Sequence, residues 1–249
     1  MANILEKYGI KEVADVTFYN IKDDGTPGTP ALYLDTLKVS TIEQTAENVS
    51  ARGGKGNPEL IIWDYNKEIN VTLEDALFSA KSMAIMFGTE SKADSTVTTL
   101  YKTFMAIATD TTPLATMTVP IAGKDVTLTD CSWFAPDAAA DSAALASVAS
   151  GERYIVRGTL GISSYREIKI SPDTFPGNYY ITGDTYARSE VTGEDEMFQF
   201  IIPKAKVLSE VTLTMEAEGD PSTFNLNLKV LRPASGEMMK LIQYKLGSN

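Results

Sequence analysis

The 249-residue sequence contains no histidine and only one cysteine. Without histidine, the commonest general base and the commonest metal ligand are missing, and a Ser-His-Asp triad is excluded. A single cysteine, Cys131, cannot form an internal disulfide or a zinc site built on paired cysteines. Trp133 and Phe134 follow closely, which favours a buried thiol over a reactive one. We therefore expect no enzymatic activity, no cofactor and no metal.

Long apolar runs and basic residues are also scarce. No segment approaches the ~20 apolar residues that span a bilayer, and the N-terminal residues lack the pattern of a signal peptide. We expect a soluble protein from a reducing compartment, with no membrane partner. Lys and Arg number 22 against 33 Asp and Glu, which gives a net charge of −11. This balance argues against a protein that binds nucleic acid through its phosphates.

Alternation of apolar and polar residues is abundant. It has the period of two that is expected of half-buried strands, most clearly over residues 206–218 and 224–230, which we expect to form one long hairpin. The sequence therefore predicts one β-rich domain, with further strands over residues 13–19, 31–41 (extending to about 47), 60–63, 67–73, 100–108, 154–162, 167–170, 179–182 and 197–202, and a hairpin over residues 115–129.

One stretch changes period. From Leu73, apolar residues recur at three- and four-residue steps up to Phe87, which predicts a helix over about residues 73–87. Thr72 is placed to cap its start, and Gly88 to end it. We expect this helix, packed on the sheet, to be the nucleus of the fold.

The domain organisation predicted is a single domain over residues 1–249. Residues 89–150 are rich in Ser, Thr and Ala and form either an insertion or a subdomain within it. Inside this region, residues 135–150 favour a short helix or a surface insertion.

A polar, glycine-rich segment covers residues 48–58. It includes Arg52 and Lys55 but lacks the residue order of a phosphate-binding loop. The composition is typical of an extended loop or hairpin tip that reaches a neighbour, and equally of a mobile loop without a partner.

Carboxylates are densest at Glu194-Asp195-Glu196 and at Glu216, Glu218 and Asp220. A solvated acidic loop and the outer face of a strand explain them better than a catalytic pair, because no apolar pocket is evident nearby. A weak divalent-cation site has no recognisable ligand spacing at either place.

The last third of the chain carries a resemblance to a known family. The run FQFIIPKAKVLSEVTLTMEAEGDPSTFNLNLKVLRP, residues 198–233, is followed by Met238-Met239-Lys240-Leu241, and RGGKGNP at residues 52–58 precedes a strand. These segments resemble the tail tube (major tail) proteins of long-tailed bacteriophages.

The resemblance implies a fold and an assembly. The fold would be two packed antiparallel sheets, sandwich- or barrel-like, flanked by the helix. Subunits would form hexameric rings that stack into a hollow tube in the virion tail, assembled in the host bacterial cytoplasm. Partners would be other copies, and tail proteins such as the tape measure, terminator, and baseplate or sheath. A loop would reach the adjacent subunit, a role that falls on Arg52, Gly53, Gly54, Lys55, Gly56 and Asn57.

The acidic balance suggests how such a tube would treat DNA. Carboxylates that line the bore would repel phosphates over the Debye length of roughly 8–10 Å, so DNA would pass without specific binding. The candidates for this lining are Glu210, Glu216, Glu218, Asn225 and Asn227; a wet outer surface is the other interpretation of the same face.

Two alternatives to a DNA tube are open. One is a β-sandwich binding module on a virion surface, receptor- or glycan-binding, with an aromatic-lined pocket that uses Trp63, Tyr65 or Trp133. The other is the inner tube of a contractile particle that injects protein.

Overall fold

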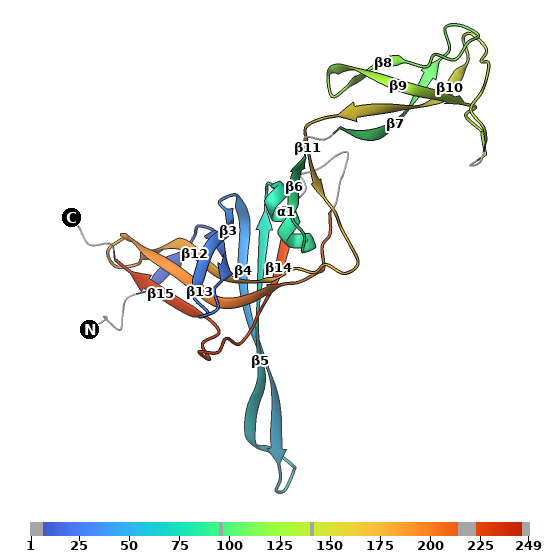
Figure 1. Cartoon of the computed structure of the whole chain (residues 1–249). Helices are drawn as coiled ribbons and strands as arrows, with labels where there is room; N and C mark the ends of the chain where they lie inside the picture. Colours follow the sequence, from blue (N-terminus) through green and yellow to red (C-terminus); the bar gives the residue numbers. More distant parts are fainter. Residues whose placement is uncertain (1–6, 95–96, 140–141, 214–222, 246–249) are drawn as a thin grey trace. The chain divides into compact units, whose positions relative to one another are not determined.

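A computed structural model of the chain describes residues 7–94, 97–139, 142–213 and 223–245. Within these ranges, fifteen strands and one α-helix form two compact units, Met1–Ser91 with Ile168–Asn249 and Lys92–Glu167. The second unit thus interrupts the first in sequence (Figure 1). It includes most of the Ser/Thr/Ala-rich region 89–150. Whether the whole chain behaves as one domain stays a prediction.

The first unit is an antiparallel sheet of nine strands with a short helix. Hydrogen bonds order seven strands as β3-β2-β12-β13-β14-β5-β4, while β1 pairs with β12 and β15 pairs with β13. The elements are β1 (Tyr8–Ile10), β2 (Asp15–Ile21), β3 (Pro27–Leu34), β4 (Leu37–Arg52), β5 (Glu59–Asp75), α1 (Ala80–Phe87), β12 (Asn178–Ser189), β13 (Asp195–Val207), β14 (Phe224–Val230) and β15 (Lys240–Tyr244).

Alternate side chains of these strands form the core of the first unit. Phe18, Leu73, Ile181, Ile202 and Leu226 come from five different strands, and each is at most 1% exposed. Complete burial of a side chain of this size contributes roughly 1.5–3 kcal/mol, so this one cluster supplies most of the driving force for folding the unit.

The predicted fold class is confirmed: the protein is mainly β, antiparallel and sandwich-like, with one helix among the described residues. The strands around the core belong to a single hydrogen-bonded sheet with two free ends. Its two end strands, β3 and β4, contribute Leu34 and Leu37 to the same core. Between them, the Thr36 hydroxyl donates a hydrogen bond to Asp75 Oδ1 at 2.5 Å.

The helix is shorter than the predicted span of about residues 73–87, because Leu73 belongs to β5. There it pairs with Leu226 of β14 on one side and Ser40 of β4 on the other. Because this part of the backbone is paired within the sheet, it cannot also form the first turn of a helix. The helix begins after Ser79 instead of Thr72. The Ser79 hydroxyl accepts a hydrogen bond from the Ser82 N–H at 3.0 Å, in a capping box.

Helix α1 ends at Gly88, as predicted. Gly88 has a φ of 68°, the left-handed conformation in which glycine avoids the steric cost that a Cβ brings. Across the part of the chain that the structure describes, no helix has the length and apolar content needed to cross a membrane.

Two strand boundaries differ from the prediction. Residues 31–47 contribute to two strands, β3 and β4, and not to one, because the chain turns at Asp35 and Thr36. Conversely, the strands predicted over residues 60–63 and 67–73 are both part of β5. The alternation shifts at Asn66, which has a φ of 53° and lies near an irregularity in the pairing with β4, but the ladder continues past it.

The strand predicted over residues 206–218 is wrong for residues 208–213, because β13 ends at Val207. Residues 208–213 form no strand, and residues 214–218 lie outside the described residues. The predicted hairpin partner, β14, pairs with β13 only at residues 205–207 and otherwise with β5. Alternation of apolar and polar residues indicates which side chains can face a core. It does not indicate which strand supplies the backbone hydrogen bonds.

The second unit has its own sheet, with the strand order β7-β10-β9-β8. The strands predicted over residues 100–108 and 154–162 and the hairpin over residues 115–129 are confirmed, whereas the described part of residues 135–150 contains no helix. The elements are β6 (Ser91–Asp94), β7 (Thr98–Ile107), β8 (Met117–Ile121), β9 (Lys124–Phe134), β10 (Arg153–Ile162) and β11 (Tyr165–Ile168), of which β6 and β11 pair with each other.

Trp133 and Val156 are the centre of the second core. The Trp133 indole N–H donates a hydrogen bond to the Leu114 carbonyl at 3.0 Å, so its polar atom is satisfied despite burial. Cys131 packs against this cluster and is half-buried. Burial raises the pKa of the Cys131 thiol and so favours its protonated form.

We predict that Gly88→Ala destabilises the protein more than Gly193→Ala. Both glycines have a similar positive φ, 68° and 72°, so the backbone strain is matched. A Cβ at Gly88 would lie 2.1 Å from the backbone carbonyl carbon of Phe175, whereas Gly193 has nothing within 4 Å. Thermal unfolding followed by circular dichroism measures the difference. Equal melting temperatures for the two variants would contradict the packing at the end of α1.

Candidate functional site

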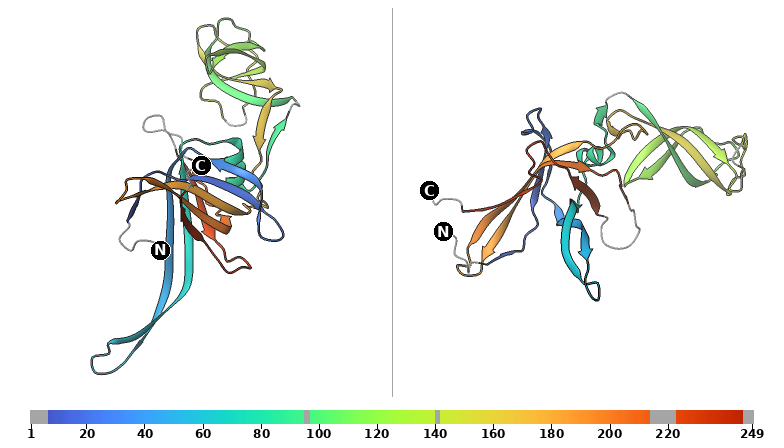
Figure 2. Two further views of the ribbon diagram at one scale, coloured as in Figure 1. Left: turned by 90° about the vertical axis from the view of Figure 1, so that its left-hand side faces the viewer. Right: turned by 90° about the horizontal axis from the view of Figure 1, so that it is seen from below.

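Strands β4 and β5 continue far past the core as a two-stranded ribbon, residues 44–67, which we call the arm (Figures 1 and 2). Within β5, Ile69, Val71 and Leu73 are buried at alternate positions, as the sequence alternation predicts. No residue between 44 and 67 is buried. The arm is therefore a sheet extension with no core of its own on either face.

One face of the arm is apolar. Trp63 pairs with Val49, Ile61 pairs with Ala51, and Tyr65 pairs with Glu47, so these cross-strand partners project on the same side. Val49, Ile61, Trp63 and Tyr65 are each 51–53% exposed. We call the following set the apolar face of the arm: Val49, Ala51, Ile61, Trp63 and Tyr65.

The opposite face of the arm is more polar. Asp64 pairs with Asn48 there, and Ile62 pairs with Ser50. A ribbon of only two strands is at best marginally stable in water, and an exposed apolar patch with a polar rim is typical of an interaction site. The arm thus has the properties of a surface that binds an apolar partner and gains order from it.

The structure brings the predicted loop residues together at the tip of the arm, in the turn between β4 and β5. Arg52 and Glu59 form an ion pair across the ribbon. Beyond them the Asn57 N–H donates a hydrogen bond to the Gly54 carbonyl at 3.1 Å. The turn also contains Gly53, Lys55 and Gly56. Of the two interpretations of this segment, the geometry is that of a hairpin tip; a contact with another subunit stays a prediction.

The predicted lumen residues are only partly brought together. Asn225 and Asn227 share the outer face of β14, where the Thr72 hydroxyl of β5 donates to Asn227 Oδ1 at 3.4 Å. Glu210 is exposed but lies in the segment after β13 that forms no strand. Glu216 and Glu218 lie outside the described residues. The lining role of these residues stays a prediction.

That face of β14 is not purely acidic. Lys229 follows Asn225 and Asn227 in the same alternation, and its ammonium forms an ion pair with Glu68 of β5 at 2.8 Å. The pair is partly exposed, so its contribution to stability is small. It does, however, neutralise the only basic side chain that β14 places there.

The aromatic pocket that a binding module would need is not built from the three predicted residues. Trp133 is 2% exposed in the core of the second unit, whereas Trp63 and Tyr65 project from the arm of the first. Among the described residues, no three acidic or thiol side chains gather as a metal site.

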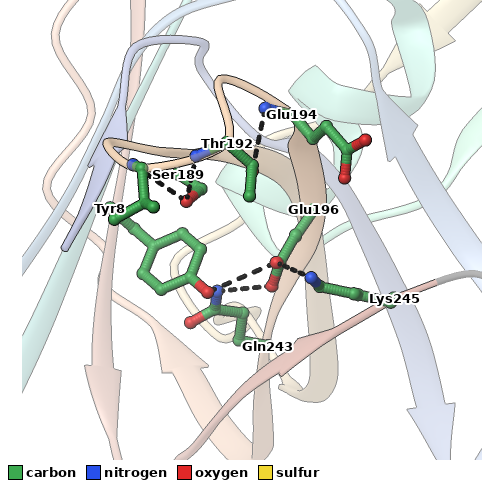
Figure 3. A network of polar contacts seen from close by, with 8 residues as sticks. Tyr8, Ser189, Thr192, Glu194, Glu196, Gln243 and Lys245 are labelled. Carbon is green, nitrogen blue, oxygen red and sulfur yellow. Dashed lines mark hydrogen bonds and ion pairs between the residues drawn. The ribbon is translucent and has the colours of Figure 1, made fainter. Parts of the chain in front are cut away.

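A buried carboxylate, Glu196, joins three other polar side chains (Figure 3). It receives hydrogen bonds from the Tyr8 hydroxyl at 3.3 Å and from the Gln243 amide at 2.7 Å, and an ion pair with Lys245 at 2.9 Å. Because Tyr8 belongs to β1, while Gln243 and Lys245 lie in and just after β15, Glu196 ties two edge strands to β13. The hydrogen bond with Lys245 is the largest of the effects that lower the pKa of Glu196.

The expectation that Glu196 lies in a solvated acidic loop is wrong. Only Glu194 is exposed without an ion pair; Asp195 accepts two hydrogen bonds of 2.7 Å from Arg188 at the start of the β12–β13 hairpin. A signal was present, because Glu196 is in phase with Phe198, Phe200 and Ile202. That phase assigns it to the core side of the strand.

We predict that Glu196→Gln loosens β15 and removes part of the acid sensitivity of the protein. A carboxylate with a lowered folded pKa stabilises the fold above its unfolded pKa, about 4.3. That stability is lost as the pH falls through the folded pKa. The wild type should therefore lose protection of the β15 amides below about pH 4.3, whereas the variant is less protected at pH 7 and changes less. Hydrogen exchange of the β15 amides in both proteins, measured at pH 7 and below about pH 4.3, tests this. Identical exchange in the wild type and the variant at each pH would contradict the role of Glu196.

The comparison with known proteins extends over almost the whole chain. A search of curated proteins finds no match. The profile of the YomU/Tube protein family matches residues 8–243, from β1 through the arm and the second unit to β15. This span covers both units and the exposed hairpin. The chain belongs to the YomU/Tube protein family and is a phage-derived, tube-like structural protein of the virion.

Proposed function

We propose that this chain is a tail tube subunit. Copies associate as hexameric rings, and the rings stack into a hollow tube through which phage DNA is ejected. Membership of a tube family supports a structural and non-enzymatic role. The arm is the observation that favours polymerisation, because its apolar face has no partner among the described residues of its own chain.

The arm suits contact between rings. It extends past the sheet that forms its base, so its tip and apolar face are available to a second molecule (Figure 2). A head-to-tail contact, in which the arm of one copy meets a different surface of the next, generates an open polymer instead of a closed dimer. Gly53, Gly54 and Gly56 at the tip allow close backbone approach to that neighbour.

Open strand edges suit contact within a ring. In the described sheet, β3 pairs only with β2, and β4 pairs only with β5, so each end strand has one edge without a ladder. Unpaired edges are a template for another chain, and ring closure satisfies them. Pairing between the end strands of adjacent subunits would make one continuous sheet around the ring.

The charge of the chain suits a bore that DNA passes without specific binding. At a net charge of −11, carboxylates from six copies would repel phosphates within the Debye length of roughly 8–10 Å. Glu210, Glu216 and Glu218, with Asn225 and Asn227, are the proposed lining. The tube would assemble in the host bacterial cytoplasm and meet the tape measure, the terminator, and the baseplate or sheath at its ends.

We predict that Ile61→Asp blocks tube formation and that Ile62→Asp has much less effect. The two residues are neighbours with 51% and 55% exposure, but Ile61 lies on the apolar face and Ile62 on the opposite face. A buried, unpaired carboxylate at an interface costs several kcal/mol, enough to abolish a weak contact. Negative-stain microscopy of both purified variants and the wild type gives the readout.

The outcomes of this test separate three cases. Tubes from the wild type and Ile62→Asp, but folded monomers from Ile61→Asp, support the proposal. Tubes from all three proteins would exclude the apolar face as the stacking contact. Discrete small particles from the wild type, at any concentration, would overturn the tube itself.

The lumen is tested by reversing its charge. We predict that changing Glu210, Glu216 and Glu218 together to Lys leaves tubes intact, because none of the three is proposed to contact another subunit. Phage with this tube should eject DNA more slowly, since each new cation gains phosphate contacts and loses repulsion. Ejection rate measured against salt checks this, with Glu90→Lys, Glu152→Lys and Glu237→Lys as the charge-matched control. Wild-type ejection by the triple variant would exclude an acidic lining.

A further inference from the structure

The outer face of the second unit has an unusual composition for a solvent-facing sheet. Strands β10 and β9 bury Val156 and Trp133 on one side, and the partly buried Phe104 of β7 packs against them there. The alternate residues of the three strands therefore face away from the core. Cross-strand pairs place these outward residues on one surface, which we call the arginine face: Tyr101, Thr103, Met105, Ile107, Ser132, Phe134, Arg153, Ile155, Arg157 and Thr159.

Arg157 is held between two aromatic rings at the centre of this face. Its guanidinium carbon lies 5.9 Å from the centre of the Tyr101 ring and 5.5 Å from that of Phe134. Cation–π contacts of this kind fix a side chain that would otherwise lose rotamer freedom on binding. The N–H groups at the edge of the guanidinium can then bind a carboxylate in bidentate fashion.

The positive charge of the arginine face is not neutralised from within. Neither Arg153 nor Arg157 has a carboxylate partner among the described residues. At one end of the face, the carboxylate of Asp130 accepts a hydrogen bond from the Thr159 hydroxyl at 3.2 Å. Two unpaired arginines on one face are notable in a chain with a net charge of −11.

Three apolar members of the face, all on β7, are exposed. Tyr101 is 72% exposed, and Met105 and Ile107 are 55% exposed. Aromatic residues, Met and Arg are enriched in protein interfaces, whereas Lys, Asp and Glu are depleted, and the arginine face contains none of these last three. Its composition is therefore that of a protein-binding surface with an arginine anchor.

We propose that the arginine face docks on a carboxylate-bearing surface of the first unit of a second copy in the tube. The inference rests on the proposed function, because the tube is what brings copies together. The first unit is the favoured partner because it carries most of the negative charge of the chain. Most of the excess of Asp and Glu over Lys and Arg lies in that unit and not in the second. Contact between two arginine faces is disfavoured, since it would bring like charges together.

Polymerisation makes such a contact effective even when it is weak alone. Once the arm holds two copies together, the second contact forms within one assembly, at an effective concentration that reaches the millimolar range. The arginine face would then add a second contact between two subunits that the arm already joins. Its contribution should fall with ionic strength, because it depends on attraction between the two arginines and carboxylates of the second copy.

A photo-crosslink identifies the partner surface directly. Met105→p-benzoylphenylalanine places a photoreactive group on the arginine face without altering its charge. Tubes are assembled from an equal mixture of ¹⁵N-labelled and unlabelled full-length chains, irradiated and digested. We expect crosslinked peptides that join the two labels and map to an acidic segment of the first unit. Crosslinks to the same chain only, to the second unit of another copy, or to a different virion protein would each overturn the proposal.

Charge reversal measures the strength of the contact. We expect Arg153→Glu with Arg157→Glu to raise the critical concentration for tube formation about tenfold or more, and this difference to vanish at high salt. The matched control is Lys124→Glu with Arg166→Glu, which makes the same charge change on the second unit outside the arginine face. Circular dichroism confirms that both variants are folded.

The two proposals fail in different ways. A wild type that forms no tube overturns the proposed function. A wild type that forms tubes, with both double variants equal to it in critical concentration, overturns only the docking of the arginine face. An equal loss in both double variants would show a general charge effect and would also overturn it.

Discussion

The arm depends on a hydrogen-bonded ladder that has no core beneath it. From Ile69 onward, β5 is anchored by buried side chains on one face. Residues 44–67 are held by cross-strand pairs, the Arg52–Glu59 ion pair and a hydrogen bond from the Asn66 amide to Glu47. Folding of the first unit orders the base of the arm, but its described residues leave Trp63 and Tyr65 about half exposed. A ribbon of only two strands is at best marginally stable in water, so a second surface that buries its apolar face would stabilise it. The proposed polymer would supply such a surface.

The rest of the first unit is the packed sheet from which the arm extends. The nine-stranded sheet buries side chains from β2, β5, β12, β13 and β14 in one core, and Glu196 ties β1 and β15 to β13 through charge-assisted hydrogen bonds. The second unit has a different kind of exposed surface, the arginine face, in which Arg157 contacts two aromatic rings.

Much of the fold could be predicted from local patterns. The alternation over residues 67–73 and 224–230 assigned the core faces of β5 and β14 correctly, and Gly88 marked the end of the helix, because these features depend on neighbouring residues alone. The strand after Val207 and the start of α1 could not be predicted in the same way. At both places the outcome depends on which distant strand supplies backbone hydrogen bonds, and Leu73 fits a strand and a helix equally well. The partners of Glu196 come from both ends of the chain, and local sequence does not contain that information.

Hydrogen exchange of the arm before and after polymerisation tests whether another copy of the chain covers the arm in the assembled tube. In the free chain, backbone amides of residues 44–67 should exchange far faster than those of β12 and β13, whose side chains pack on the core. On polymerisation the arm amides should become protected by at least about a hundredfold, while β12 and β13 change little. An arm that is equally protected at every protein concentration, or that stays unprotected in the assembled state, would contradict the account.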